Sequence, residues 1–321
     1  MHLGLTPWRP TKGDALSLVE QALFAEQLGY QSFWLPENHF NDSAIPDPLM
    51  LLAAVASSTR NIKLATSSYL LPLRHPLQAA EQVAVLDRLS GGRVILGVGR
   101  GVGANMLRAF NVQPHQKRRQ FERNLNIMIK AWSGQAILTS SATDPDLDSK
   151  VTLHPLPVQQ PHPEIWVAAF GPKALAQAGR LGLPYLASPI ETLGDLKRNF
   201  NLHSQECQKA GKATPLIRPV MRTAHVSNDS RVVANLRALF NKHMNNQNET
   251  SAWRDRRAAL DDWAIIGNEQ FARQKIAEYQ QTLGMTHLIV TRLWVGTPQE
   301  EEQRMSLALL ADIVADDATR R

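Results

Sequence analysis

The chain has very little cysteine, with Cys207 as the only such residue in 321. A single thiol excludes a disulfide within the chain and any zinc site built from cysteines. Apolar stretches are also short. None approaches the roughly 18 residues needed to cross a bilayer, so no transmembrane helix is expected. The first residues do not form a basic segment followed by a long apolar one, so no secretory signal is expected. These absences predict a cytoplasmic protein, and we expect neither a membrane contact nor a metal site.

The sequence also lacks a basic stripe, although its formal net charge is +6. Lysine and arginine are scattered among acidic residues, as in residues 254–257. No segment interleaves basic residues with aromatic ones that could stack on bases. We therefore expect no nucleic-acid partner, and a mild positive charge suits a small ligand that carries a phosphate.

Apolar, strand-like runs alternate with segments of helical periodicity along the whole chain. Nearly all of the predicted strands are followed by a predicted helix, which favours parallel pairing. The pattern gives eight strands, at residues 3–6, 32–36, 62–71, 94–98, 165–169, 185–188, 216–226 and 287–292.

Eight strands spread over the chain predict an α/β fold, a (β/α)8 TIM barrel with insertions, although a doubly wound sheet would produce part of the same pattern. Neither a linker-like break nor a short repeat interrupts the sequence, so we expect a single domain over residues 1–321. Two polar segments, residues 134–160 and 245–257, are candidate lids over a site.

The chemistry of such a barrel lies at the carboxyl ends of its strands. Asn38 and His39 directly follow the second predicted strand. A histidine at this place could transfer protons near neutral pH, and the alternative is a histidine that only satisfies loop backbone groups.

A glycine-rich stretch, residues 97–104, follows the fourth predicted strand. Gly99, Gly101 and Ala104 fit a loose G-x-G-x-x-A pattern, but a dinucleotide fingerprint belongs on the first strand of its unit. The glycines let the backbone approach a flat or anionic ligand, and Arg100 offers a planar fork for phosphate oxygens. A tight turn with a surface arginine is the alternative.

Small residues also lie in the middle of the third predicted strand and shortly after the fifth. Ser67 and Ser68 leave room for a large planar ligand, or they are ordinary residues of the barrel interior. Gly171 precedes a predicted helix, whose first N–H groups could bind an anion. An ordinary connection between strand and helix explains Gly171 equally well.

Together these stretches resemble the luciferase-like flavin monooxygenases, a family that includes bacterial luciferase. The resemblance implies a barrel that binds reduced flavin at the carboxyl ends of its strands. It extends in order over nearly the whole chain and is carried by residues 29–40, 71–76, 86–93, 97–101, 161–167, 181–184 and 283–288.

The resemblance implies roles for individual residues. Arg100 and Arg118 match the residues that hold the flavin phosphate, whereas Arg108 and Arg119 are only their neighbours in sequence. The backbone around Gly171 would assist them. The Ser67–Ser68 pair falls where this family often has a bulge or a non-prolyl cis peptide behind the flavin ring.

One position departs from the family. Members close to bacterial luciferase have two adjacent histidines after the second strand, and the first is catalytic. This chain has Asn38 and then His39. Asn38 can donate a hydrogen bond but cannot act as a general base. His39, or His225 at the end of the seventh predicted strand, could take over proton transfer.

The resemblance implies an enzyme that uses reduced flavin mononucleotide (FMN), supplied by a separate flavin reductase, and O2 to oxidise a small organic substrate. The protein would position the ring and exclude water. Hydride transfer with a deazaflavin coenzyme, or flavin binding without catalysis, are the alternatives. The family also implies a homodimer through the helices after the second and third strands, which carry Leu49, Leu52, Val55, Val83 and Leu86.

Overall fold

The structure is a computed structural model that describes residues 1–9, 14–139, 149–246 and 259–319. Contacts divide the chain into two compact units. The first unit contains Met1–Pro10, Phe24–Phe33 and Ala169–Arg321, and the second contains Thr11–Leu23 and Trp34–Ala168. Helix α1 (Ala15–Gln27) and strand β2 (Ser32–Leu35) contribute residues to both.

The first unit is built on parallel strands. Its hydrogen-bonded order is β11-β10-β12-β1-β2, and each paired strand lies parallel to its neighbour. Strand β10, which pairs with β11 on one side and β12 on the other, is buried along its whole length, as expected for a parallel strand covered on both faces. The strands are β1 (His2–Leu5), β9 (Tyr185–Leu186), β10 (Pro219–Val226), β11 (Ala264–Gly267) and β12 (His287–Thr291).

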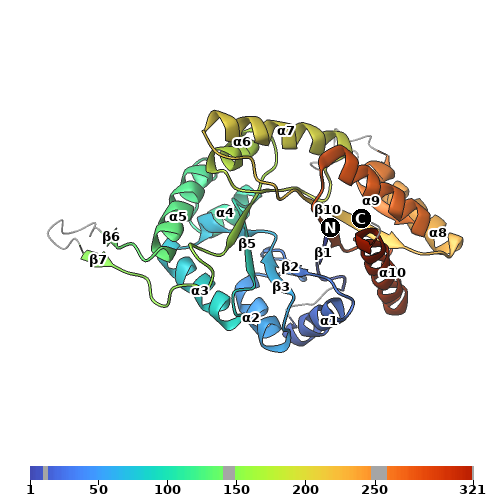
Figure 1. The fold of residues 1–321 in the computed structure, drawn as a ribbon, viewed down its shortest axis with the longest axis horizontal. Coiled ribbons are helices and arrows are strands. Elements are labelled where there is room, and N and C mark those ends of the chain that lie inside the picture. Colours follow the sequence, from blue (N-terminus) through green and yellow to red (C-terminus); the bar gives the residue numbers. More distant parts are fainter. Residues whose placement is uncertain (10–13, 140–148, 247–258, 320–321) are drawn as a thin grey trace. The chain divides into compact units, whose positions relative to one another are not determined.

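Local sequence signals fix the helices of the first unit. Helix α6 follows Gly171, and Gly182 ends it at φ +68° in the left-handed conformation that glycine tolerates. The start of α7 is a capping box in which Thr192 and Asp195 bond each other's backbone N–H groups. The helices are α6 (Pro172–Leu181), α7 (Leu193–Lys209), α8 (Ser230–Asn246), α9 (Glu269–Leu283) and α10 (Glu300–Thr319), with a 3-10 turn at Leu260–Asp262 (Figure 1).

In the second unit, strand β5 pairs in parallel with β3, β4 and β8. A separate antiparallel hairpin, β6–β7, extends away from the end of α5 (Figure 1). The strands are β3 (Lys63–Thr66), β4 (Tyr69–Leu70), β5 (Val94–Gly99), β6 (Ile137–Thr139), β7 (Ser149–Val151) and β8 (Glu164–Ala168). The helices are α2 (Pro48–Ser58), α3 (Pro76–Leu89), α4 (Ala104–Ala109) and α5 (Lys117–Trp132), with a 3-10 turn at Leu71–Leu73.

The predicted alternation of parallel strands and helices is confirmed, with local differences. The predicted strand 62–71 is split into β3, β4 and the 3-10 turn. Helix α7, strand β11 and the β6–β7 hairpin were not predicted. The candidate lids, 134–160 and 245–257, lie partly outside the described residues, and the single-domain expectation stays a prediction.

Within the described ranges, no helix combines the length and apolar character required to span a bilayer.

Candidate active site

A buried carboxylate stands at the end of strand β2. Glu37 lies two residues after the strand, and its side chain is 0% exposed. Its Oε1 accepts hydrogen bonds from Arg74 Nη1 at 2.7 Å and His39 Nε2 at 2.9 Å. Its Oε2 accepts one from the backbone N–H of Leu70 at 2.9 Å. The carboxylate is therefore neutralised by a cation and held in one orientation, as a charge buried in a protein must be.

His39, a predicted catalytic residue, is fixed on two sides. Its side chain is only 7% exposed, and Glu37 holds its Nε2. The ring of His39 meets the ring of Phe110 edge to face, with 4.8 Å between ring centroids. Phe40 in turn stacks on Phe110 at 5.6 Å. A histidine held in this way has a defined orientation for proton transfer.

Asn38, the other residue predicted to be catalytic, shapes the loop. Its Oδ1 accepts a hydrogen bond from the backbone N–H of Ile45 at 3.0 Å, and its own N–H donates to Ile45 O at 3.1 Å. The side-chain carbonyl is thus engaged in closing the loop that carries His39, which leaves the amide nitrogen as the group that can donate to a ligand.

Ser67, Ser68 and Gly99 form a surface of small residues. The peptide bond between the two serines is cis, one of the two geometries that the resemblance implied. A β-carbon at Gly99 would overlap Oγ of Ser68 and would lie 2.9 Å from its Cβ. Only glycine at this position lets Ser68 pack against strand β5.

Three cations gather around the end of β5. Arg100 follows this strand directly, and its Nη2 donates to Ala168 O at 3.1 Å. Lys117 begins helix α5, and its Nζ donates to Gly101 O at 2.9 Å. Arg118 is the next residue of the helix and is exposed.

Their proximity is visible in their pKa values. Burial, followed by repulsion from Arg118, lowers the pKa of Arg100 to about 10. Burial, followed by repulsion from Arg100 and then Arg118, lowers the pKa of Lys117. Each positive charge makes it less favourable for the other two groups to stay protonated. A polyanion bound here would therefore be stabilised by all three charges.

Other predicted residues lie elsewhere. Arg108 is exposed on α4, where it bonds Asn105 at 3.2 Å, and Arg119 is exposed on α5. Gly171 is the N-cap residue of α6 at φ +83° and belongs to the first unit. In the described part of the chain, no atom beyond the neighbouring residues lies within 4 Å of the position that a β-carbon at Gly171 would occupy.

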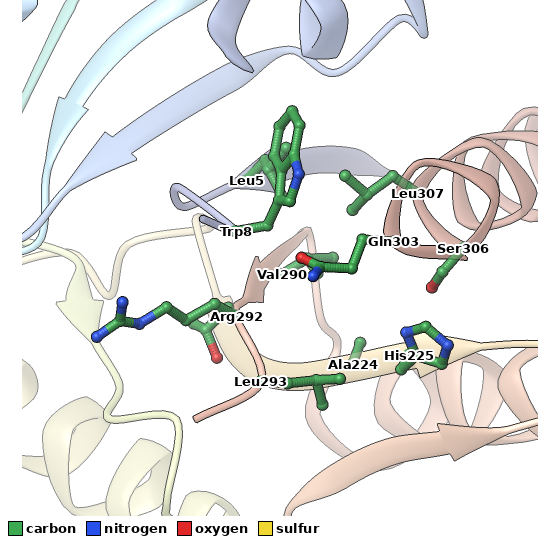
Figure 2. A pocket seen from close by; sticks show the side chains of 11 residues that line it. Leu5, Trp8, Ala224, His225, Val290, Arg292, Leu293, Gln303, Ser306 and Leu307 are labelled. Atoms are coloured by element: carbon green, nitrogen blue, oxygen red, sulfur yellow. The ribbon is translucent and has the colours of Figure 1, made fainter. Parts of the chain in front are cut away.

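His225, the alternative for proton transfer, faces helix α10. Its side chain borders a small cavity of about 20 Å³ whose wall includes Gln303 and Ser306 of that helix (Figure 2). The residue is 2% exposed, and its Nε2 has no hydrogen-bond partner among the described residues. Burial lowers the pKa of His225. This position argues against a direct role in proton transfer.

Two features of the site were not predicted from the sequence. The ion pair between Glu37 and Arg74 joins the stretches 29–40 and 71–76, which the sequence pattern did not connect. Lys117 was not singled out, although its neighbour Arg118 was. The run of basic residues from Lys117 to Arg119 at the start of helix α5 was the available signal.

A family model describing the luciferase-like monooxygenases matches residues 3–305. The chain belongs to this family. Membership confirms the resemblance and the predicted class of enzyme.

Relatives in the family include named monooxygenases. Limonene 1,2-monooxygenase of Rhodococcus erythropolis is 26% identical over 297 residues, which cover 87% of this chain and 76% of that protein. The oxygenase component of the flavin-dependent trigonelline monooxygenase of Acinetobacter baylyi is 25% identical, with coverage of 86% and 78%. The y4vJ protein of Sinorhizobium fredii is 33% identical over 56% of this chain, and the match spans 52% of that protein, about half its length.

Solved structures share the fold of this chain. The oxygenating constituent of 3,6-diketocamphane monooxygenase from Pseudomonas putida, solved with FMN, has a TM-score of 0.83 at 22% identity and 98% coverage of both chains. The coenzyme F420-dependent tetrahydromethanopterin reductase of Methanopyrus kandleri has a TM-score of 0.73 at 16% identity, again with 98% coverage of both. These likenesses confirm the predicted (β/α)8 TIM-barrel class.

Proposed function

We propose that this protein is the oxygenase of a two-component system, which uses reduced FMN and O2 to oxygenate a small organic substrate. The cation cluster of Arg100, Lys117 and Arg118 is the observation that carries the proposal. Relatives named as flavin-dependent monooxygenases support it, and so does the FMN complex of a structural neighbour. A relative described as an oxygenase component supports a separate reductase as the partner that supplies the flavin.

The cluster fits the phosphate of FMN. A phosphate monoester carries close to two negative charges at neutral pH and accepts several hydrogen bonds. Arg100 offers a planar fork, and Lys117 offers a compact ammonium group. Binding of the phosphate would offset both the burial and the mutual repulsion that lower the pKa values of Arg100 and Lys117. The charge of this site therefore favours FMN over a flavin without a phosphate.

The small residues fit a planar ring. Gly99 presents no side chain, and Ser67 and Ser68 are half-buried. The space at Gly99 where a β-carbon would lie is already filled by Ser68, so the surface formed by these residues is closely packed. We propose that the ring system of FMN lies against this surface. When bound and reduced, FMN supplies the electrons that activate O2.

His39 is the proposed proton-transfer group. Because a carboxylate only accepts hydrogen bonds, Nε2 of His39 carries a hydrogen toward Glu37. In the neutral ring, Nδ1 then has the free lone pair and can accept a proton. Glu37 stabilises the imidazolium that results, while Arg74 balances the carboxylate when the histidine is neutral. Asn38 positions this loop.

We also propose a homodimer through helices α2 and α3. The residues first considered for this interface, Leu49, Leu52, Val55, Val83 and Leu86, are all buried in the core. Three other apolar side chains of the same helices are exposed: Met50 by 72%, Val85 by 44% and Leu89 by 62%. Such side chains gain free energy from burial against a second copy, and sedimentation velocity of the intact protein measures the state directly.

An anaerobic titration with reduced FMN tests the function. Replacing Arg100 or Lys117 with alanine should weaken binding of reduced FMN by about 10- to 100-fold, the range for a charged hydrogen bond. Arg119→Ala is the matched control, because Arg119 is the exposed neighbour of Arg118, and it should change the affinity by less than about twofold.

The outcomes separate the candidate functions. Tight binding of reduced FMN, followed by substrate-dependent oxygen uptake, supports an FMN monooxygenase. Preference for the reduced deazaflavin coenzyme, with no oxygen uptake, indicates hydride transfer instead. Equal effects of Arg100→Ala and Arg119→Ala would contradict the phosphate site.

A further inference from the structure

Phe40 combines two features that are unfavourable for a phenylalanine. Its backbone is left-handed at φ +62°, and its side chain is 71% exposed. The left-handed region is disfavoured for residues with a bulky side chain. Asn111, the other non-glycine residue with positive φ in the described segments, is of a type that tolerates this conformation. The residue type therefore explains the positive φ of Asn111 but not that of Phe40.

The loop around Phe40 imposes the conformation. Ile45 bonds Asn38 in both directions, at 3.0 and 3.1 Å. Ser43 N donates to Asn41 Oδ1 at 3.0 Å, and Ala44 N donates to Asn41 O at 3.0 Å. Unfavourable backbone conformations persist where surrounding bonds determine them, and they gather at functional sites. An exposed ring gains little from burial, so core packing does not explain the choice of phenylalanine.

The exposed ring belongs to an aromatic surface that ends at His39. Phe40 stacks on Phe110 with an interplanar angle of 27°, and Phe110 meets the ring of His39 at 60°. Nε2 of His39 is bonded to Glu37, whose charge Arg74 balances. The surface of the two phenylalanine rings carries no charge of its own. A ligand on this surface would lie beside the proposed proton-transfer residue.

We infer that the Phe40–Phe110 pair binds an uncharged, apolar ring of the substrate. Aromatic faces provide flat contact area for such a ring, and burial of Phe40 on binding would recover the free energy lost by its exposure. The inference rests on the proposed function for its meaning, because it assigns the substrate class of that same site. Binding itself can be measured without flavin.

Ligand binding to the flavin-free protein tests the inference, with limonene and cyclohexanone as uncharged ring probes and trigonelline as a charged one. Saturation-transfer NMR and calorimetry should show that the wild type binds the uncharged probes more tightly than it binds trigonelline. Phe40→Asn should weaken their binding about tenfold, as expected for an aromatic contact that is buried on binding. The same variant should melt a few degrees higher, because asparagine tolerates the left-handed backbone.

Two further variants keep the test decisive. Leu16→Asn is the matched control, since Leu16 is 75% exposed on α1, and it should change neither the affinity nor the melting temperature. Phe110→Leu probes the second ring if Phe40→Asn does not fold, and it should weaken binding of the same probes. Weaker probe binding in the phenylalanine variants, with unchanged affinity for reduced FMN, supports the inference.

The remaining outcomes overturn one proposal or the other. If Phe40→Asn weakens the binding of reduced FMN as much as the binding of the probes, the phenylalanine pair contacts the flavin and the inference is wrong. Tighter binding of trigonelline than of the uncharged probes, or no binding of limonene and cyclohexanone to the wild type, also overturns it. If reduced FMN does not bind but the probes still depend on Phe40, the proposed function fails and the apolar site stands.

Discussion

The buried ion pair between Glu37 and Arg74 gives a prediction whose size follows from the structure. Glu37→Gln keeps the shape of the side chain but removes its charge. The carboxylate accepts from Arg74, His39 and the N–H of Leu70, and its side chain is 0% exposed. An amide can accept through only one oxygen, so at least one of these donors loses its partner.

The expected loss of stability lies below that of a fully buried pair. Removing one partner of a buried ion pair typically costs about 3–5 kcal/mol. Arg74 keeps other contacts, because its side chain is 18% exposed, its Nη1 also donates to Leu70 O at 3.2 Å, and its guanidinium carbon lies 4.0 Å from the ring centre of Tyr69. We therefore expect Glu37→Gln to cost about 2–3 kcal/mol. Arg74→Met leaves the carboxylate buried without its cation and should cost more, about 3–5 kcal/mol.

Urea unfolding of a double-mutant cycle measures the pair. Glu37→Gln, Arg74→Met and the double variant should give a coupling free energy of at least about 1.5 kcal/mol, because the double variant leaves no unpaired charge. Arg198 and Asp195 provide the control cycle, as an ion pair on α7 in which the arginine side chain is 73% exposed, and its coupling should stay below about 0.5 kcal/mol. Equal coupling in the two cycles would refute the argument that burial makes the Glu37 pair strong.

Two more changes have defined outcomes. Gly99→Ala should cost about 1–3 kcal/mol in thermal unfolding through overlap with Ser68, and Ser68→Gly in the same chain should recover most of that loss; no recovery would locate the overlap elsewhere. Burial lowers the pKa of His225, so the unfolded chain binds its proton more readily and wild-type stability falls as the pH drops below 6.5, the ordinary histidine value. His225→Leu should remove this part of the acid sensitivity in unfolding experiments across pH 5 to 7, whereas an unchanged slope would assign it to other groups such as His203.

The strands and helices were predictable where each segment buries a continuous face. The prediction failed where tertiary contacts decide whether a segment forms a strand or a turn. The run 62–71 has apolar residues on both sides of Ser67 and Ser68, so its sequence pattern does not reveal that the strand is interrupted between β3 and β4. Strand β11 was missed although it is as long as β1 and β2, which were predicted. Helix α7 was predictable, because Thr192 and Asp195 have the spacing of a capping box and its buried residues recur at helical intervals.

The sequence predicted the candidate site only as a set of strand ends. Which side chains from distant segments contact each other depends on tertiary packing, which the sequence pattern does not give. The stretch after β5 contains several basic residues. The family resemblance singled out Arg118 among them, but not Lys117. Helix α5 begins at Lys117, whose ammonium group reaches back to Gly101, while Arg119 remains exposed. Along an α-helix, side chains two residues apart point in directions that differ by about 200°. The residue at which helix α5 begins therefore decides which cation joins the cluster, and no side-chain cap among the described residues marks that start.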